Sequence, residues 1–243
     1  MFVNKQRKIN QLKEEIHSIS FYRPNELDKT LDYFLGKDSN SKDAYQFEVL
    51  IYLQKIICNS IQYGDFAYAS LSRPHSAPKG FDSNCFRPRN SKDYKNIDLY
   101  DNPVFISGLK NPIIACPWNN QRIVDNIRYI GKGNNNKFDS KNSNIDNVYI
   151  YPLGIVLVNN GNHSQLSAVL KNEFDQVKIN RIYDISLALK NSDSEFSNFY
   201  GYSRINNRVV RDKWISLMKI GSILGNNKFF PPEILNNLRE EQR

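Results

Sequence analysis

The amino-acid sequence predicts an α+β fold in which a central region of strands and helices lies between two helical regions. Three observations indicate this class. Apolar residues recur at helical spacing in residues 1–64, short apolar runs alternate with helical segments from about 103 to 185, and helical spacing returns after about 194. The chain has 243 residues, 40% of them hydrophobic, which is enough for one large domain or two small ones.

Residues 1–64 are expected to form three helices. Pro24 stands where the second helix could begin, since proline is common in a first helical turn. The third helix should run from about Asp43 to Tyr63 and end at Gly64, a typical residue after a helix C-terminus. It is apolar on most sides, which predicts a position deep in the core. The three apolar faces are formed by Ile9, Leu12, Ile16 and Ile19; by Leu27, Leu31, Phe34 and Leu35; and by Phe47, Leu50, Ile51, Leu53, Ile56 and Ile57.

Residues 71–101 are predicted to form a long basic loop. Pro74, Pro78, Gly80 and Pro88 interrupt regular structure, and basic residues outnumber acidic ones. Such a loop could clamp a phosphate backbone, and a solvated connector is the alternative. Its basic residues are Arg73, Lys79, Arg87, Arg89, Lys92 and Lys95.

The central region should begin after this loop and contain strands, helices and a surface insertion. Short β-rich runs predict the strands, and Gly- and Asn-rich stretches predict the turns between them. The expected elements are strands at 104–106 and 112–116, a helix from 119 or 120 to 130, an insertion at 132–147, strands at 148–150 and 154–158, a turn at 159–161, a helix at 164–172 and a strand at 177–183.

The C-terminal part is expected to be helical, with Val210, Trp214, Leu217 and Met218 as an apolar stripe. Three arginines, Arg204, Arg208 and Arg211, follow the spacing i, i+4 and i+7, which predicts one shared helical face. That face is a candidate for nucleic-acid phosphate contacts, and a solvated surface is the alternative. The whole chain is therefore divided into a helical region at 1–70, a core at 71–190 and a helical region at 191–243 that packs on the core.

The net charge of +8 and the pI of about 9.2 suit a polyanionic partner, such as nucleic acid, a nucleotide or anionic lipid. A proteome rich in Lys and Asn would give the same balance. Three widely spaced cysteines, Cys58, Cys85 and Cys116, argue against a disulfide framework and favour a reducing compartment. No signal peptide and no membrane-spanning run is evident, so we expect a soluble, cytoplasmic protein without a membrane partner.

The segment Gly161-Asn162-His163-Ser164 carries the clearest chemical signal. It lies between a buried strand and a helix, where unpaired backbone N–H groups and the positive end of the helix dipole favour an anion. Gly161 would allow close approach of a ligand, Asn162 and Ser164 could cap the helix or bind phosphate, and His163 could act as a general acid or base. The alternative is an ordinary Asn-Gly-Asn turn with a helix cap and a structural histidine.

This pattern resembles the signature of the ParB/sulfiredoxin superfamily, a strand followed by Gly-x-His-Arg or Gly-x-Arg-Arg and a helix with Ala near its second turn. The segment from Pro112 to Asn119 is similar to the strand that leads to the superfamily's first motif, and Gln121-Arg122-Ile123 opens the next helix. The resemblance covers roughly residues 103–185. Tyr151-Pro152-Leu153-Gly154-Ile155 is closer still to uncharacterised bacterial proteins that carry a Gly-Asn-His-Ser motif.

The resemblance implies a small mixed sheet with flanking helices, and a phosphate site at the start of the signature helix. Gly161, Asn162, His163 and Ser164 would bind phosphate, and Asn119 and Arg122 would face the same pocket. Superfamily members bind ATP or CTP and several bind or cut DNA, which implies a nucleoside triphosphate and Mg²⁺ as cofactors. The ligands of the metal are not evident from the sequence. Phage defence or a mobile element is the implied context.

Two positions depart from the superfamily pattern. Ser164 stands where an arginine is usual, so a two-pronged phosphate donor is missing. Arg122, or one of Arg204, Arg208 and Arg211, would have to supply that charge. Asn162 stands where sulfiredoxin has its reactive cysteine, which argues against peroxide chemistry.

Two classes of function remain open from the sequence. The first is an enzyme, a nuclease or nucleoside triphosphatase with His163 as its catalytic residue. The second is a non-catalytic module that binds nucleotide or nucleic acid, or a regulator that acts through protein contacts. A homodimer is compatible with either class.

Overall fold

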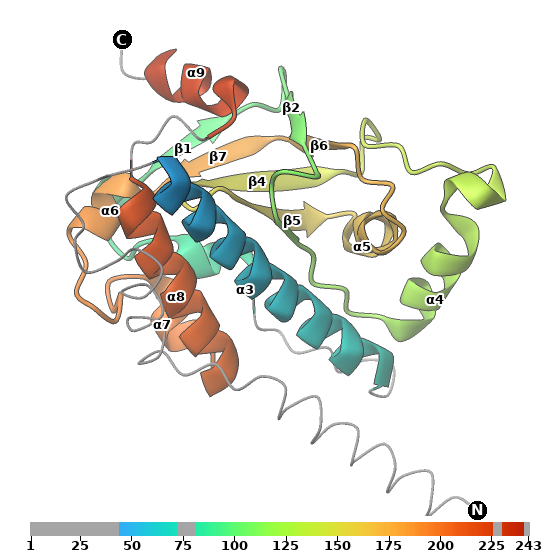
Figure 1. Cartoon of the computed structure of the whole chain (residues 1–243), viewed down its shortest axis with the longest axis horizontal. Coiled ribbons are helices and arrows are strands. Elements are labelled where there is room, and N and C mark those ends of the chain that lie inside the picture. Colours follow the sequence, from blue (N-terminus) through green and yellow to red (C-terminus); the bar gives the residue numbers. More distant parts are fainter. Residues whose placement is uncertain (1–43, 72–80, 226–229, 241–243) are drawn as a thin grey trace, which may run out of the picture.

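The structure is a computed structural model that describes residues 44–71, 81–225 and 230–240 (Figure 1). This part of the chain combines helices with a mixed five-stranded sheet and a small two-stranded sheet, so the predicted α+β class is confirmed. The two helices predicted before residue 43, and the prolines Pro74 and Pro78, lie outside the described residues.

The five-stranded sheet has the strand order β1-β7-β4-β5-β3. Two of its strand pairs are parallel, β4 with β7 and β3 with β5, whereas β4–β5 and β1–β7 are antiparallel. The central strand β4 is buried on both faces, as its near-continuous apolar run requires. The strands are β1 (Lys95–Asp98), β3 (Ile113–Ile114), β4 (Asp146–Tyr151), β5 (Ile155–Asn160) and β7 (Arg181–Asp184).

The strand predicted at 177–183 is in fact two strands in different sheets. β6 (Gln176–Ile179) pairs antiparallel with β2 (Val104–Ser107), whereas β7 joins the large sheet. The chain changes sheets at Asn180. Its backbone N–H donates to Asn147 O at 3.0 Å, and its side-chain Oδ1 accepts the Asn147 N–H at 3.2 Å. This contact between residues far apart in the chain separates β6 from β7.

The prediction of a long basic loop at 71–101 is wrong for the described residues 81–98. These residues are packed and include short elements of regular secondary structure. Phe81, Cys85 and Phe86 are buried, the last two as part of the short 3-10 helix η1 (Ser83–Phe86). A second 3-10 helix, η2 (Ser91–Asp93), leads into β1 at the edge of the large sheet. In the sequence, this edge strand has only a short alternating pattern of apolar and polar residues. The turn residues around it make that pattern hard to recognise.

Helix α3 (Ala44–Leu71) continues beyond Gly64, so the predicted stop is wrong. One side of the helix is buried and the other is not: Leu50 is 1% exposed, whereas Tyr52 is 65% exposed. The position is thus less deep than predicted. The buried side packs on β3 and on α8 (Arg208–Leu224), whose Trp214, Leu217 and Met218 are fully buried, as their predicted stripe requires.

Gln62 of α3 fixes this helix to the end of β3. Its Nε2 donates to Ala115 O at 3.0 Å, and its Oε1 accepts the Ala115 N–H at 2.5 Å. Because Gln62 is buried, both bonds are shielded from water and both amides are satisfied. The clamp holds the chain immediately before the segment 116–119.

The other helices surround the sheet. Figure 1 shows α3 crossing in front of the sheet with α8 beside it, α6 and α7 near one end, and α4 and α5 near the other. No helix in the described ranges is both long enough and apolar enough to cross a bilayer. The predicted insertion 132–147 ends earlier than expected, since β4 includes residues 146 and 147. The remaining bounds are η3 (Lys132–Asn134), α4 (Asn120–Tyr129), α5 (Asn162–Leu170), α6 (Ser186–Lys190), α7 (Tyr200–Arg204) and α9 (Pro232–Glu240).

Candidate functional site

Two helices begin side by side at one edge of the large sheet. The parallel strands β3 and β5 are neighbours, and each is followed by a helix, α4 after β3 and α5 after β5. Parallel strands present their carboxyl ends at the same edge, which is where open sheets commonly bind ligands. The N-termini of α4 and α5 therefore come together there, and all six residues predicted for the phosphate site lie at this junction.

Gly161 is the N-cap of α5 and has a left-handed backbone, with φ of 80°. A Cβ at this position would lie 2.7 Å from Ile145 Cδ1, so both the conformation and the space require glycine. The prediction that Asn162 or Ser164 caps α5 is wrong. Both residues lie inside the first turn, and Ser164 Oγ donates to Gly161 O at 3.0 Å.

The segment 116–119 is held against the first turn of α5 by two hydrogen bonds. Asn162 Oδ1 accepts the Cys116 N–H at 2.7 Å, and His163 Nε2 accepts the Asn119 N–H at 3.2 Å. The side chain of Asn119 caps α4 by accepting the Arg122 N–H at 2.9 Å. Asn119 thus stabilises the junction in two ways. Its backbone N–H donates to His163, and its side chain caps α4.

His163 is only 8% exposed, and its Nε2 lone pair is already used. An imidazole that accepts at Nε2 is neutral and carries its proton on Nδ1. Burial lowers the pKa of His163 below its ordinary value, and the positive charge of Arg122 lowers it further. The imidazole is therefore held neutral around physiological pH.

The lowered pKa gives a prediction for stability. The unfolded chain binds a proton at His163 more readily than the folded protein, so the free energy of unfolding should fall as the pH drops through about 6.5. The slope from this group is at most about 1.4 kcal/mol per pH unit. In denaturant titrations between about pH 7.5 and 5, His163→Gln, which keeps a side-chain acceptor, should lose less stability than wild type. Equal slopes for the two proteins would contradict the assignment.

Trp118 and Arg122 form the outer wall of the junction. Trp118 is 52% exposed, and its ring meets the His163 ring edge-on, with 5.3 Å between ring centres. The Arg122 guanidinium lies 5.1 Å from the centre of the Trp118 ring. An exposed aromatic ring beside an exposed guanidinium is a surface on which a base and a phosphate can both bind.

The first turn of α5 retains unsatisfied donors. Gly161 provides no side-chain cap, and the first intrahelical bond runs from the Gln165 N–H to Gly161 O. Within the described part of the chain, the backbone N–H groups of residues 162–164 have no protein acceptor. Such donors at a helix N-terminus favour an anion.

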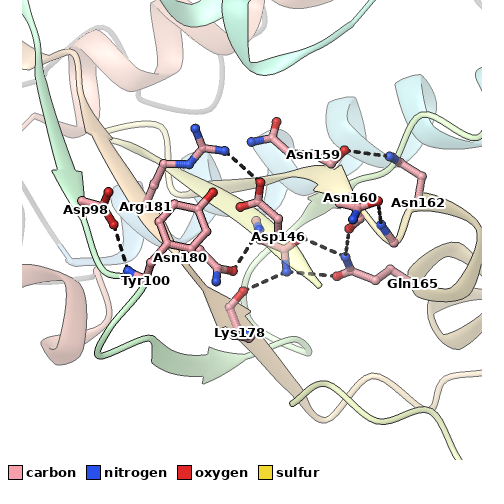
Figure 2. A network of polar contacts seen from close by, with 12 residues as sticks. Asp98, Tyr100, Asp146, Asn159, Asn160, Asn162, Gln165, Lys178, Asn180 and Arg181 are labelled. Carbon is pink, nitrogen blue, oxygen red and sulfur yellow. Dashed lines mark hydrogen bonds and ion pairs between the residues drawn. The ribbon is translucent and has the colours of Figure 1, made fainter. Parts of the chain in front are cut away.

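A network of buried side-chain amides also holds α5 on the sheet (Figure 2). Gln165 Nε2 donates to Asn147 Oδ1 at 2.9 Å and to Asn160 O at 3.0 Å, and its Oε1 accepts from Asn147 Nδ2 at 3.0 Å. Gln165 and Asn147 are completely buried. At the end of the network, Arg181 pairs with Asp146 at 2.9 Å. These contacts fix the direction in which the first turn of α5 points its backbone N–H groups.

The three C-terminal arginines do not share one helical face, so that prediction is wrong. Arg204 ends α7, residues 205–207 interrupt the helix, and Arg208 begins α8. Asn207 caps α8, which fixes the break. Arg204 pairs with Asp82 at 2.9 Å and Arg211 lies over the Tyr202 ring, so neither interaction involves α5. Arg122, in contrast, lies near His163 in the first turn of α5.

A family model matches residues 4–223, and its description is a family of unknown function, DUF6710. The chain belongs to this family. No curated protein and no solved structure gives a match. The DUF6710 match includes the whole junction of α4 and α5 and all three C-terminal arginines.

In this DUF6710 chain, sequence reasoning missed three residues that shape the site: Trp118, Asn147 and Gln165. Trp118 lies within the motif that suggested the site, so its position beside Asn119 was an available signal. Nothing in the sequence indicates that Asn147 and Gln165 are buried against each other. In the described ranges, no group of three or more His, Cys, Asp or Glu side chains is placed to hold a metal ion.

Proposed function

We propose that this protein binds a phosphate group of a nucleotide or nucleic acid at the N-terminus of α5. The observation that carries the proposal is the set of three backbone N–H groups at residues 162–164 that have no acceptor among the described residues. They lie at the carboxyl ends of two parallel strands, beside a second helix N-terminus.

The electrostatics of the junction support an anionic ligand. Arg122 is exposed, and its charge is the one that acts on His163. In the superfamily pattern an arginine is usual at the position of Ser164, and we propose that Arg122 supplies that charge from α4. The neutral imidazole adds no charge, so the ligand would be held by Arg122, the two helix dipoles and the free N–H groups.

Binding without catalysis is the function that the geometry supports better. A general base needs a free lone pair within reach of its substrate. His163 uses Nε2 to accept from Asn119 and is nearly inaccessible. The nuclease or nucleoside triphosphatase activity, with His163 as the catalytic residue and Mg²⁺ as a cofactor, remains the alternative. We also retain as proposals the ParB/sulfiredoxin-like fold, a role in phage defence and a homodimer.

The proposal predicts that Arg122→Gln weakens ligand affinity by about tenfold, because one charge-assisted contact is lost. If the ligand is nucleic acid, the dependence of log affinity on log salt should also become shallower by about 1. Fluorescence anisotropy with labelled ATP, CTP, DNA and RNA would measure both effects.

Arg128→Gln is the matched control, since Arg128 is an exposed arginine at the other end of α4. It removes the same charge and should leave the affinity nearly unchanged. Equal weakening by both variants would mean that only net charge matters. The same samples, incubated with and without Mg²⁺, would reveal any product. Turnover that disappears in His163→Gln would favour the enzyme over the binding module.

A further inference from the structure

A small basic pocket lies between η1 and α7. It has a volume of about 230 Å³ and is lined by Asn84, Arg87, Tyr200 and Arg204. None of its lining residues belongs to the junction of α4 and α5. Two of the four residues are arginines, which sets this pocket apart as a place for an anion.

The walls of the pocket are held by backbone pairing between two distant segments. The Tyr200 N–H donates to Arg87 O at 3.0 Å, and the Arg89 N–H donates to Asn198 O at 2.8 Å. Asp82 caps η1, on which Asn84 lies. The pocket is therefore preformed by ordered backbone, as small-ligand sites usually are.

Arg87 carries a charge that no carboxylate neutralises in the described part of the chain. Its guanidinium lies 5.5 Å from the centre of the Tyr94 ring, and its buried Nε has no hydrogen-bond acceptor. A buried Nε cannot reach a ligand in the pocket directly, so a ligand would bind the Nη atoms of Arg87, which have no acceptor in the described part of the chain. Its charge and its donors are thus available to a ligand.

The other two arginines near the pocket differ in their partners. Arg204 uses Nη2 to pair with Asp82, and both of these side chains are about half exposed. Arg89 lies over the Tyr200 ring, with 5.5 Å to its centre, and its Nη2 donates to Ser203 Oγ at 2.8 Å. Of Arg87, Arg89 and Arg204, only Arg204 forms an ion pair with a carboxylate within the described part of the chain.

We propose that this pocket binds the phosphate group of a small phosphate ester. Two arginines line it, and guanidinium matches the geometry of phosphate oxygens. The volume is below the range of about 300–1,000 Å³ that holds a drug-sized ligand, which indicates a phosphate group with at most a small substituent. Free phosphate, a sugar phosphate and the terminal phosphate of a nucleic acid share this chemistry.

Isothermal titration calorimetry in phosphate-free buffer tests the proposal, with inorganic phosphate, ribose 5-phosphate and a 5′-phosphorylated oligonucleotide as separate probes. The expected result is saturable binding of at least one probe by the wild type and a loss of about tenfold or more in Arg87→Gln. Arg87→Lys should fall between the two, because it keeps the charge but not the planar fork. The probe with the highest affinity identifies the source of the phosphate.

Two controls keep the result specific. Arg239→Gln removes an exposed arginine of α9 and should bind as the wild type does. Arg122→Gln should leave the binding that depends on Arg87 unchanged, even if it weakens binding at the proposed site at α5. Asn84→Asp adds a negative charge to the lining without a change of size, so it should abolish binding even if Arg87→Gln fails to fold. No binding by the wild type, or equal binding by Asn84→Asp, would overturn the proposal.

Discussion

Gln165→Glu is expected to lower the free energy of unfolding by about 3–5 kcal/mol at neutral pH, the usual cost of an uncompensated buried charge. The substitution keeps the shape of the side chain but replaces Nε2, which donates to Asn147 and Asn160, by a second acceptor. Gln165 is completely buried, so water cannot solvate the new charge. Because α5 rests on this amide, ligand affinity at the turn should fall as well.

The pH dependence separates the effect of the buried charge from the effect of the lost hydrogen-bond donor. Burial should raise the pKa of the introduced carboxyl above about 4.3, its value in the unfolded chain. The destabilisation should therefore grow as the pH rises above about 4.3 and be smallest in acid. Denaturant titrations of wild type and variant at about pH 5 and 8 would measure this. Gln176→Glu, the same change at an exposed position of β6, should have little effect at either pH. A destabilisation that does not depend on pH would contradict the inference that the buried charge causes it.

Gly201→Ala is expected to cost about 3 kcal/mol of stability or more, at the upper end of what overpacking costs in a core. A Cβ here would lie 2.5 Å from the carbonyl oxygen of Cys85 and 2.6 Å from Cε2 of Trp214. The first is backbone and the second belongs to a fully buried ring, so neither can move aside easily. Since Gly201 seats α7 against η1, the basic pocket should be disturbed too.

Gly133→Ala is the matched control for this effect, because an added Cβ there meets nothing within 4 Å. Thermal or chemical unfolding should place Gly133→Ala close to wild type and Gly201→Ala far below it. Phosphate binding by Gly201→Ala should weaken together with stability. A Gly201→Ala protein as stable as wild type would show that α7 and η1 pack less tightly than the structure indicates.

The sequence was most informative where local pattern and burial agree. The apolar stripe with Trp214 and the helix that starts after Asn119 were predicted correctly, because side-chain spacing alone determines which face of a helix is buried. The strand β1 was missed and β6–β7 was taken as one strand. Edge pairing and a change of sheet are decided by contacts between residues far apart in the chain.

The candidate site shows the same division. Glycine, asparagine, histidine and serine between a strand and a helix indicated a turn with polar function, and the structure places them beside Asn119 and Arg122. The partners of each side chain were not predictable. Asn162 and His163 accept N–H groups from a segment more than forty residues earlier, and the three arginines near the C-terminus are separated by a break at Asn207.

By itself, the sequence determined the α+β class and the change from strand to helix at Gly161, because hydrophobic period and turn chemistry are local properties. The predicted turn at 159–161 and helix start at Ser164 were wrong in their bounds, since β5 extends to Asn160 and α5 begins at Asn162. Only the tertiary structure decided that His163 is a buried, neutral acceptor and that Arg122 is the cation beside the turn. It also decided that Arg87 faces a pocket without a carboxylate partner among the described residues. Burial and charge pairing depend on which distant segments the fold brings together, and these are the quantities that determine what a polar side chain can do.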